Sequence, residues 1–498
     1  MTARNLFMEN TNEAHFKKPS LLLALIPIVV LIGLLSLNVI YYGDMATAGA
    51  NQVSLILAAA VAIGVGLVLK VPFSFMLKGI ISSINSSMGA ILILLMIGAL
   101  AGTWLISGVV PAMIYYGLQI LNPVIFLFAT VVVCAIVSVA TGSSWATVAT
   151  VGIALLGIGK ALSIHEGMIA GAVISGAYFG DKISPMSDTT NLAPAMAGTD
   201  LFTHIRYMMY TTVPSLVITL IIFLAIGFFT PHSGSVENIS ALSDAIKLKF
   251  NLNPVLFIVP LTVIWMIIKK VNALTALLIG SLLGGIFAVI FQPQIIEEIV
   301  GGTGSYIQKS YMAITNAMSV EVKVASDNEI AAGLLKARGM NGMLNTIWLI
   351  ISAMCFGGVM ESVGLLRRIT EPLVKKAKST GALVATTAGS CIFTNITASD
   401  QYLSIVVPGR MFAQTYKDRG LAPENLSRTL EDAGTVTSVL VPWNTCGATQ
   451  TGVLGVATFT YLPFCFFNII SPFMTVFFAY AGIKIRKLKA AKTETLAA

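Results

Sequence analysis

A polar stretch that contains two prolines interrupts one of the long apolar segments of this 498-residue chain. It runs from Gly176 to Pro194 and carries two aspartates, one lysine and several hydroxyl and amide side chains. Pro185 and Pro194 cannot continue an α-helix without a break. Polar backbone at membrane depth is tolerated only where it is buried in protein or lines a cavity, and charged groups there are usually functional. The stretch therefore predicts a helix broken inside a membrane, with an ion site at the break.

Composition indicates that almost the whole chain lies in a membrane. The sequence is 56% hydrophobic and only 10% charged, whereas a soluble domain has about 25% charged residues. Apolar runs of 18 or more residues without a charge, such as Leu21 to Tyr42, are typical of membrane spans. The net charge of +8 comes from lysines and arginines at the ends of apolar runs. This is the positive-inside pattern, so we expect the lipid bilayer as a partner and no nucleic acid.

We expect an all-α polytopic protein with about ten transmembrane helices and two re-entrant hairpins. The predicted spans are 20–41, 51–69, 88–110, 167–197 (broken), 209–230, 254–268, 273–291, 346–366, 427–457 (broken) and 458–482. The regions 123–160 and 382–415 each have a small-polar cluster at the centre, which predicts a hairpin. The positive-inside rule places the tails 1–19 and 483–498 in the cytoplasm. The long mixed segment 292–345 predicts an amphipathic stretch at the membrane surface.

The two halves of the chain repeat one order of elements: span, hairpin, broken span, span. The halves are 20–231 and 254–482, joined by an extracytoplasmic linker at 232–253. From the hairpin tip to the helix-breaking proline is 43 residues in the first half (142 to 185) and 44 in the second (398 to 442). Paired broken helices in an inverted repeat indicate a secondary transporter with a midplane site. Chance recurrence of such spacings is the alternative.

Asp188 is the first candidate for an ion ligand, because it follows Pro185 by three residues, where the helix should be unwound. Sodium prefers oxygen ligands, which unwound carbonyls and the side chains of Ser187, Thr189 and Asn191 can supply. A carboxylate in a low-dielectric site can hold either a proton or a cation, and that competition suffices to couple two fluxes. Alternatively, Asp188 caps the half-helix that follows the proline.

Two further aspartates are candidates. Asp400 lies at the tip of the second hairpin and is either an ion ligand or a helix N-cap. Asp181 either binds an ion or a proton, or forms an ion pair with Lys182. Such a pair would only offset the cost of burying the two charges. We place sodium at Asp188, Asn191 and Asp400. The three aspartates are the only acidic residues that we place at the core, and we place no histidine there.

Uncharged side chains near the breaks complete the predicted site as dipolar ligands. They are Ser143, Ser144, Ser184, Asn395, Thr397, Ser399, Asn444 and Thr445. Glu361, in the cytoplasmic third of its span, either gates the site or reaches to the membrane surface. We interpret Glu431 and Asp432 as charges at a helix N-terminus. The sequence has no nucleotide-binding, zinc or hydrolase motif, so we expect no enzyme activity, no cofactor and an ion gradient as the energy source.

Three motifs resemble the NhaC family of Na⁺/H⁺ antiporters. The longest lies within 176–212 and includes Gly-Asp-Lys-Ile-Ser-Pro-Met-Ser-Asp-Thr-Thr-Asn-Leu-Ala-Pro. The second half agrees through 394–402 and through Val-Pro-Trp-Asn-Thr-Cys-Gly at 441–447, and the resemblance covers 20–485. It implies exchange of Na⁺ for H⁺ at a bacterial inner membrane. It also implies a superfamily whose members use two hairpins and two broken helices.

The same family contains proteins that resemble malate/lactate antiporters, so a coupled exchanger of small carboxylates is the alternative function. An anionic substrate favours a cationic site or a helix N-terminus. The predicted core contains one lysine, Lys182, against three aspartates, and this balance favours cations. A channel or a non-transporting membrane protein does not account for the paired broken helices. Whether the chain forms a homo-oligomer is left open.

Overall fold

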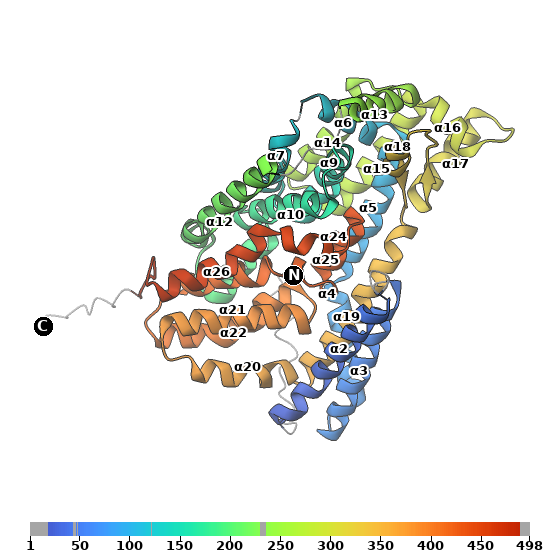
Figure 1. Ribbon diagram of the computed structural model, residues 1–498. Coiled ribbons are helices and arrows are strands. Elements are labelled where there is room, and N and C mark those ends of the chain that lie inside the picture. Colours follow the sequence, from blue (N-terminus) through green and yellow to red (C-terminus); the bar gives the residue numbers. More distant parts are fainter. Residues whose placement is uncertain (1–17, 43–45, 47, 121, 230–235, 489–498) are drawn as a thin grey trace, which may run out of the picture.

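The computed structural model of the chain describes residues 18–42, 46, 48–120, 122–229 and 236–488. Apart from one short pair of strands, its regular elements are helices (Figure 1), which confirms the predicted all-α fold. Most of the predicted tail 1–19 and the end of the tail 483–498 lie outside the described residues.

The described helices are suited to a membrane. Eight of them are long and apolar enough to cross one, or up to ten if two bent helix pairs each count as one span. The bent pairs are Ser240–Lys249 with Pro254–Ile268, and Thr458–Phe464 with Phe466–Tyr480. In a helix the backbone N–H and C=O groups form hydrogen bonds with one another. They need no partner from the surroundings, and lipid offers none. The chain is therefore a multi-pass membrane protein.

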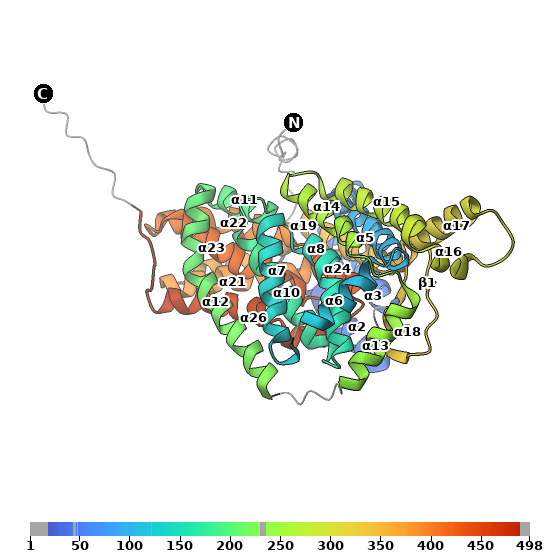
Figure 2. The same ribbon diagram turned by 90° about the horizontal axis from the view of Figure 1, so that it is seen from above.

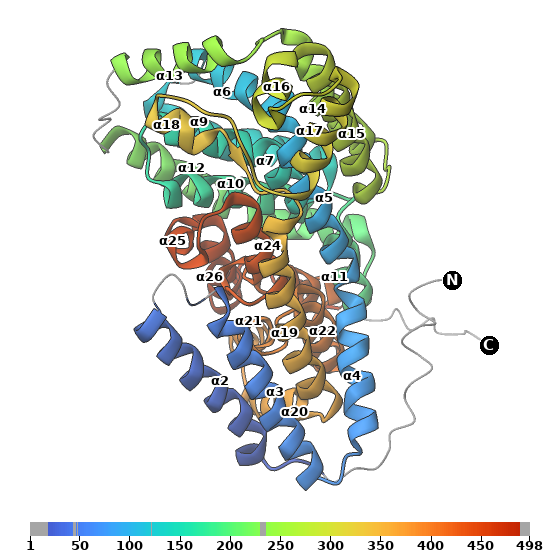
Figure 3. The same cartoon turned by 90° about the vertical axis from the view of Figure 1, so that its right-hand side faces the viewer.

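One bundle combines three helices from the start of the sequence with two from its second half (Figure 3). Its members are α2 (Leu21–Tyr42), α3 (Ala50–Val68), α4 (Phe73–Ser86), α19 (Leu344–Ser362) and α20 (Leu365–Lys376). Helices α4 and α19 pack closely: a Cβ added at Gly79 would lie 2.6 Å from the Cβ of Ser362. Small residues permit such close contact between membrane helices. Helix α4 was not among the predicted spans.

A second bundle surrounds α5 (Met88–Ile106). It contains α6 (Val109–Ile120), α13 (Val236–Lys249), η4 (Pro254–Phe257), α14 (Ile258–Ile268), α15 (Ala273–Phe291), α16 (Pro293–Val300) and α17 (Tyr306–Ser319). Beyond α17 lie β1 (Val322–Lys323), α18 (Glu329–Leu334), β2 (Lys336–Ala337) and η5 (Asn341–Met343). Helix α17 buries the face that carries Ala313 and Ala317, whereas Ile307 and Tyr311 are exposed on the other side. Figure 2 shows α16 and α17 projecting from the body of the molecule.

The central helices carry the predicted breaks. They are η2 (Pro123–Ile125), α7 (Phe126–Thr141), α8 (Ser144–Thr147), η3 (Val148–Gly152), α9 (Ile153–Ala161), α10 (Glu166–Ile183), α11 (Asp188–Ala197) and α12 (Leu201–Phe229). The second half supplies α21 (Thr380–Thr397), α22 (Gln401–Asp418), α23 (Pro423–Leu430), η6 (Glu431–Thr435), η7 (Ser438–Leu440), α24 (Thr445–Leu454), α25 (Thr458–Tyr461), η8 (Leu462–Phe464) and α26 (Phe466–Tyr480). The breaks fall between α10 and α11 and between η7 and α24.

The two halves contact each other reciprocally. Helix α11, after the first break, packs on α22 of the second predicted hairpin. Helix α24, after the second break, packs on η3 and α9 of the first. The limbs of the first hairpin, 123–141 and 144–161, are each as long as a span, which is longer than the short helices that we expected.

Helix α12 begins earlier than the predicted span 209–230. Its N-terminus is set by Asp200, whose side chain accepts a hydrogen bond from the backbone N–H of Thr203 at 2.9 Å. Such a cap satisfies one of the free donors of a helix start. The first turns of α12 contain polar residues, so the apolar pattern that predicted the span begins later than the helix itself. Of the predicted linker 232–253, residues 236–249 form α13, and 232–235 lie outside the described residues.

Candidate functional site

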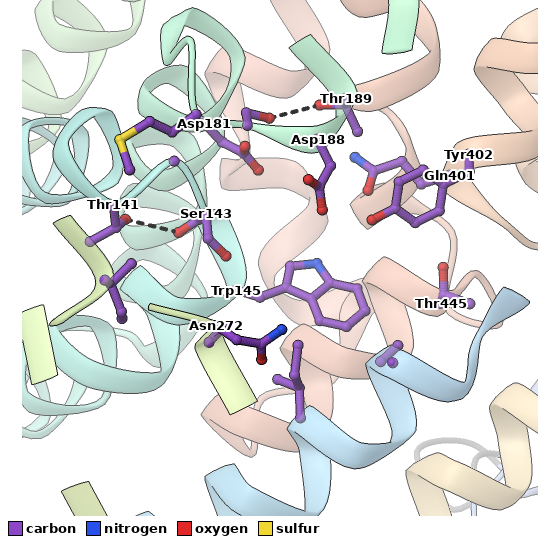
Figure 4. A pocket seen from close by; sticks show the side chains of 18 of the residues that line it. Thr141, Ser143, Trp145, Asp181, Asp188, Thr189, Asn272, Gln401, Tyr402 and Thr445 are labelled. Atoms are coloured by element: carbon purple, nitrogen blue, oxygen red, sulfur yellow. Dashed lines mark hydrogen bonds between the residues drawn. The ribbon is translucent and has the colours of Figure 1, made fainter. Parts of the chain in front are cut away.

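A pocket of about 560 Å³ lies where the first helix break and both hairpin turns meet. Three aspartates line it: Asp181 from α10, Asp188 from the start of α11 and Asp400 from the turn before α22. Figure 4 shows the side chain of Asp188 pointing into the space between Trp145 and Gln401. Both halves of the chain therefore supply acidic groups to one pocket.

Four helical segments begin at this pocket, and each start is capped by a side chain. Ser143 accepts a hydrogen bond from the N–H of Ala146 at 3.2 Å, and Asn444 accepts one from the N–H of Cys446 at 3.0 Å. Ser187 and Asp400 cap α11 and α22 in the same way. The remaining N–H groups at helix starts carry partial positive charge. They offset part of the cost of placing carboxylates here.

Asp181 is buried and fixed in place. The backbone N–H and the hydroxyl of Ser144 both donate to its Oδ2, at 3.1 and 2.6 Å. These bonds tie the end of α10 to the tip of the first hairpin. The alternative that Asp181 pairs with Lys182 is wrong, because the Lys182 ammonium contacts Asp432. Neighbouring residues on a helix do not face each other, so their side chains diverge.

Asp188 and Asp400 differ in exposure. Asp188 is exposed, as the first residue of α11, and Ser187 is the side chain that caps this helix. The predicted cap role of Asp188 is therefore wrong. Asp400 is 2% exposed, and its Oδ1 accepts a hydrogen bond from the N–H of Leu403 at 2.9 Å. Asp400 is thus a helix cap that also lines the pocket.

The other predicted ligands divide into two groups. Ser143, Ser187, Thr189 and Thr445 line the pocket. The remainder do not line it: Ser144, Ser184, Asn191, Asn395, Thr397, Ser399 and Asn444.

Those outside the pocket mostly hold its walls. The Ser184 hydroxyl donates to the carbonyl of Val139 at 2.8 Å, and the Asn191 amide donates to the carbonyls of Pro185 and Ser187. The Asn444 amide donates to the side chain of Asn395 at 3.0 Å. The Thr397 hydroxyl donates to the carbonyl of Phe393 in its own helix. Within the described residues, the buried hydroxyl of Ser399 has no hydrogen-bond partner.

Sequence reasoning missed several lining residues. Trp145, Gln401 and Tyr402 line the pocket and lie within two residues of predicted ones, so proximity in the motifs could have identified them. Lys270 and Asn272 also line it, from the turn between α14 and α15. Only the packing of the second bundle brings that turn to the pocket, and no pattern in the sequence indicates it.

The three pocket aspartates do not form a cluster that could bind one metal ion through all three carboxylates. Among the described residues, no three His, Cys, Asp or Glu side chains come close enough to hold one ion together. A cation in the pocket would therefore use one or two carboxylates together with hydroxyl, carbonyl or water oxygens, which suits a hard, flexibly coordinated ion.

A second cluster of charged residues lies buried beside the pocket. Lys182 and Asp432 form an ion pair in which both side chains are completely buried, and Thr211 donates to the Asp432 carboxylate at 2.8 Å. Glu431 is also fully buried. Both acids belong to η6, a π-helical turn inside the second broken helix. Our interpretation of them as charges at a helix N-terminus is wrong, as is the restriction of the core acids to three aspartates.

Two other titratable side chains differ from expectation. His204 is buried, and its Nδ1 lies 2.8 Å from the Ser427 hydroxyl, so a histidine does lie in the core, although it does not line the pocket. Glu361 is exposed in the last turn of α19 and interacts electrostatically with Asp400 and Arg410. Its role as a gate stays a prediction.

Comparisons with known proteins point to one class. A family model described as the Na⁺/H⁺ antiporter family matches residues 176–483. The Na⁺/H⁺ antiporter NhaC of Alkalihalophilus pseudofirmus is 38% identical over 436 residues, which is 88% of this chain and 91% of that protein. The malate-2H⁺/Na⁺-lactate antiporter of Bacillus subtilis is 36% identical over 86% of this chain and 89% of its own length. NhaC of Bacillus subtilis is 37% identical over 82% of this chain and 87% of that protein.

Proposed function

The chain belongs to the Na⁺/H⁺ antiporter family, and we propose that it exchanges sodium ions for protons at the pocket lined by Asp181, Asp188 and Asp400. The observation that carries this proposal is the meeting of carboxylates from both halves of the chain at the first helix break and the turn of the second hairpin. Such breaks are where secondary transporters place their ion sites. The family is one of transporters, and the proposal needs no cofactor besides the transported ions.

Sodium binds through Asp188 and Asp400 in this account, with Ser143 and Thr445 as neutral oxygen ligands from the same pocket. Asn191, which we also predicted as a ligand, holds the carbonyls of the first break in place. No salt bridge to Asp181, Asp188 or Asp400 is formed within the described residues. The aspartates thus need a cation or protons from solution, so Na⁺ and H⁺ compete for them.

The charge pattern supports a proposal for the cellular setting. Lysines and arginines cluster at alternate ends of the apolar runs. The positive-inside rule supports our proposal that both termini lie in the cytoplasm. We propose a bacterial inner membrane because the NhaC relatives that the chain resembles are bacterial. The lipid bilayer is then the partner of the exposed apolar side chains.

Exchange of a small carboxylate is the second candidate. The pocket of about 560 Å³ is far larger than one water, whose share of liquid volume is about 30 Å³. Lys270 lines it, and helix N-termini of the kind that bind anions open onto it. One relative is named as a malate-2H⁺/Na⁺-lactate antiporter.

Flux in proteoliposomes tests both candidates. Purified protein is reconstituted with a pH-sensitive dye inside, and a sodium gradient is applied alone or with malate or lactate. Proton movement with sodium alone supports Na⁺/H⁺ exchange. Movement that requires malate or lactate supports the second candidate, and no proton movement under any condition contradicts both.

A further inference from the structure

We propose that Glu431 is a second proton-binding group of the transport cycle, separate from the pocket. This inference rests on the proposed exchange of sodium for protons. It starts from a carboxyl group that the pocket does not use. Glu431 is completely buried in η6, and it is not among the residues that line the pocket.

The Glu431 carboxyl group lacks any compensating partner. Within the described residues, neither of its oxygens makes a hydrogen bond. Thr435 lies nearby in the same π-helical turn, but its hydroxyl is also outside hydrogen-bonding geometry. An ionised carboxylate without a partner is very costly to bury, whereas the neutral acid is much less so. In this conformation Glu431 therefore holds a proton.

The nearest cation is already used. Lys182 interacts electrostatically with Glu431, but its ammonium contacts Asp432, which also accepts from Thr211. Lys182 and Asp432 cancel each other's charge. An ionised Glu431 would add a second negative charge that the single lysine of the cluster cannot balance.

The surrounding charges define how this proton can leave. Besides Lys182 and Asp432, Glu431 interacts with Asp181, which lines the pocket. His204 on α12 lies close enough to Lys182 to interact with it. The helices packed on η6 contribute further charged residues: Asp188, Asp400, Arg410, Lys417, Asp418, Glu424 and Arg428.

These positions give a balanced step. As Na⁺ enters the pocket, the O–H bond of Glu431 breaks and its proton leaves to water, so the total charge of the pocket and the cluster is unchanged. The Lys182 ammonium is then shared by the adjacent carboxylates of Glu431 and Asp432. The reverse step reloads the proton. Because η6 is a π-helical turn, a type often found at functional sites, the Lys182 contact can move between two adjacent acids, Glu431 and Asp432, with a small shift of the backbone.

The test compares Glu431→Gln with wild type in proteoliposomes. The zero-flux membrane potential at known sodium and pH gradients gives the number of protons moved per sodium ion. Glutamine keeps the shape of the protonated acid, so we expect the variant to fold and to lower this number by one. Glu424→Gln is the matched control, since Glu424 is a buried glutamate already paired with Arg486, and it should leave the number unchanged.

Infrared difference spectroscopy provides a readout that does not depend on transport. We expect the carbonyl band of a protonated carboxylic acid in wild type at neutral pH and its loss in Glu431→Gln. An unchanged proton-to-sodium ratio in Glu431→Gln overturns the proposal, and so does the absence of that band from wild type. If wild type moves no protons with sodium, the proposed function fails, whereas a band that Glu431→Gln removes still assigns the proton to Glu431.

Discussion

The pocket and the neighbouring cluster both contain buried acids, but among the described residues only the cluster has an acid that forms an ion pair. In the pocket, Asp181, Asp188 and Asp400 meet helix starts and hydroxyls, and within the described residues no salt bridge reaches them. In the cluster, Lys182 neutralises Asp432. Removing one partner of a buried ion pair lowers the stability of the fold, because the other charge stays buried without a partner. A carboxylate without an ion pair can instead bind a cation or a proton from solution. The comparison separates Asp432, whose paired charge holds the fold together, from the unpaired acids that bind transported ions.

The largest expected effect is in the pocket. Asp188→Asn should abolish sodium-driven proton movement, because it removes the exposed carboxylate without removing a structural contact. Fluorescence of a pH dye in everted vesicles measures the effect, and the exposed Asp418→Asn is the control. Near-normal proton movement in a variant that inserts at the wild-type level would contradict the role of Asp188.

In the cluster, the expected effect is on folding. Lys182→Met leaves Asp432 buried without its cation and should lower the free energy of unfolding by about 3–5 kcal/mol. Adding Asp432→Leu removes the stranded charge as well, so the double variant should recover most of that loss. Thermal unfolding in detergent gives both values. Equal stability of Lys182→Met and wild type would show that the pair does not stabilise the fold.

A smaller effect is expected at the hairpin turn that closes the pocket. Gly142 has φ of +67°, and a Cβ there would lie 2.6 Å from the Cβ of Met186. Gly142→Ala should therefore destabilise the protein by about 1–2 kcal/mol from backbone strain alone, with a further loss from the contact. Gly198→Ala is matched in backbone, with φ of +85° and nothing within 4 Å of a Cβ. Thermal unfolding that is the same for both variants would mean that the contact with Met186 adds nothing.

The sequence allowed the breaks and the pocket aspartates to be predicted because each has a local cause. Pro185 cannot continue a helix, and Asp181, Asp188 and Asp400 stand out in apolar surroundings. The Lys182–Asp432 pair could not be predicted, because its members are 250 residues apart and meet only through packing. The adjacent Asp181 suggested a nearer but wrong partner for Lys182.

The part of the site that comes from uncharged residues was predicted less well. Asn191 and Asn444 were expected to bind the ion, but both make hydrogen bonds within the walls. Amides have donors as well as acceptors, and nearby carbonyls at a helix break compete for those donors. A residue type alone does not indicate which of these partners it takes.

The central claim is that sodium and protons compete for the same pocket carboxylates. It is tested most directly by initial rates of exchange over a series of sodium concentrations at four or five pH values. If the claim holds, the KM for sodium rises as the pH falls, by up to about tenfold per pH unit for each proton displaced. A KM that stays flat while only the maximal rate changes would contradict it, because separate sites for Na⁺ and H⁺ would give that result.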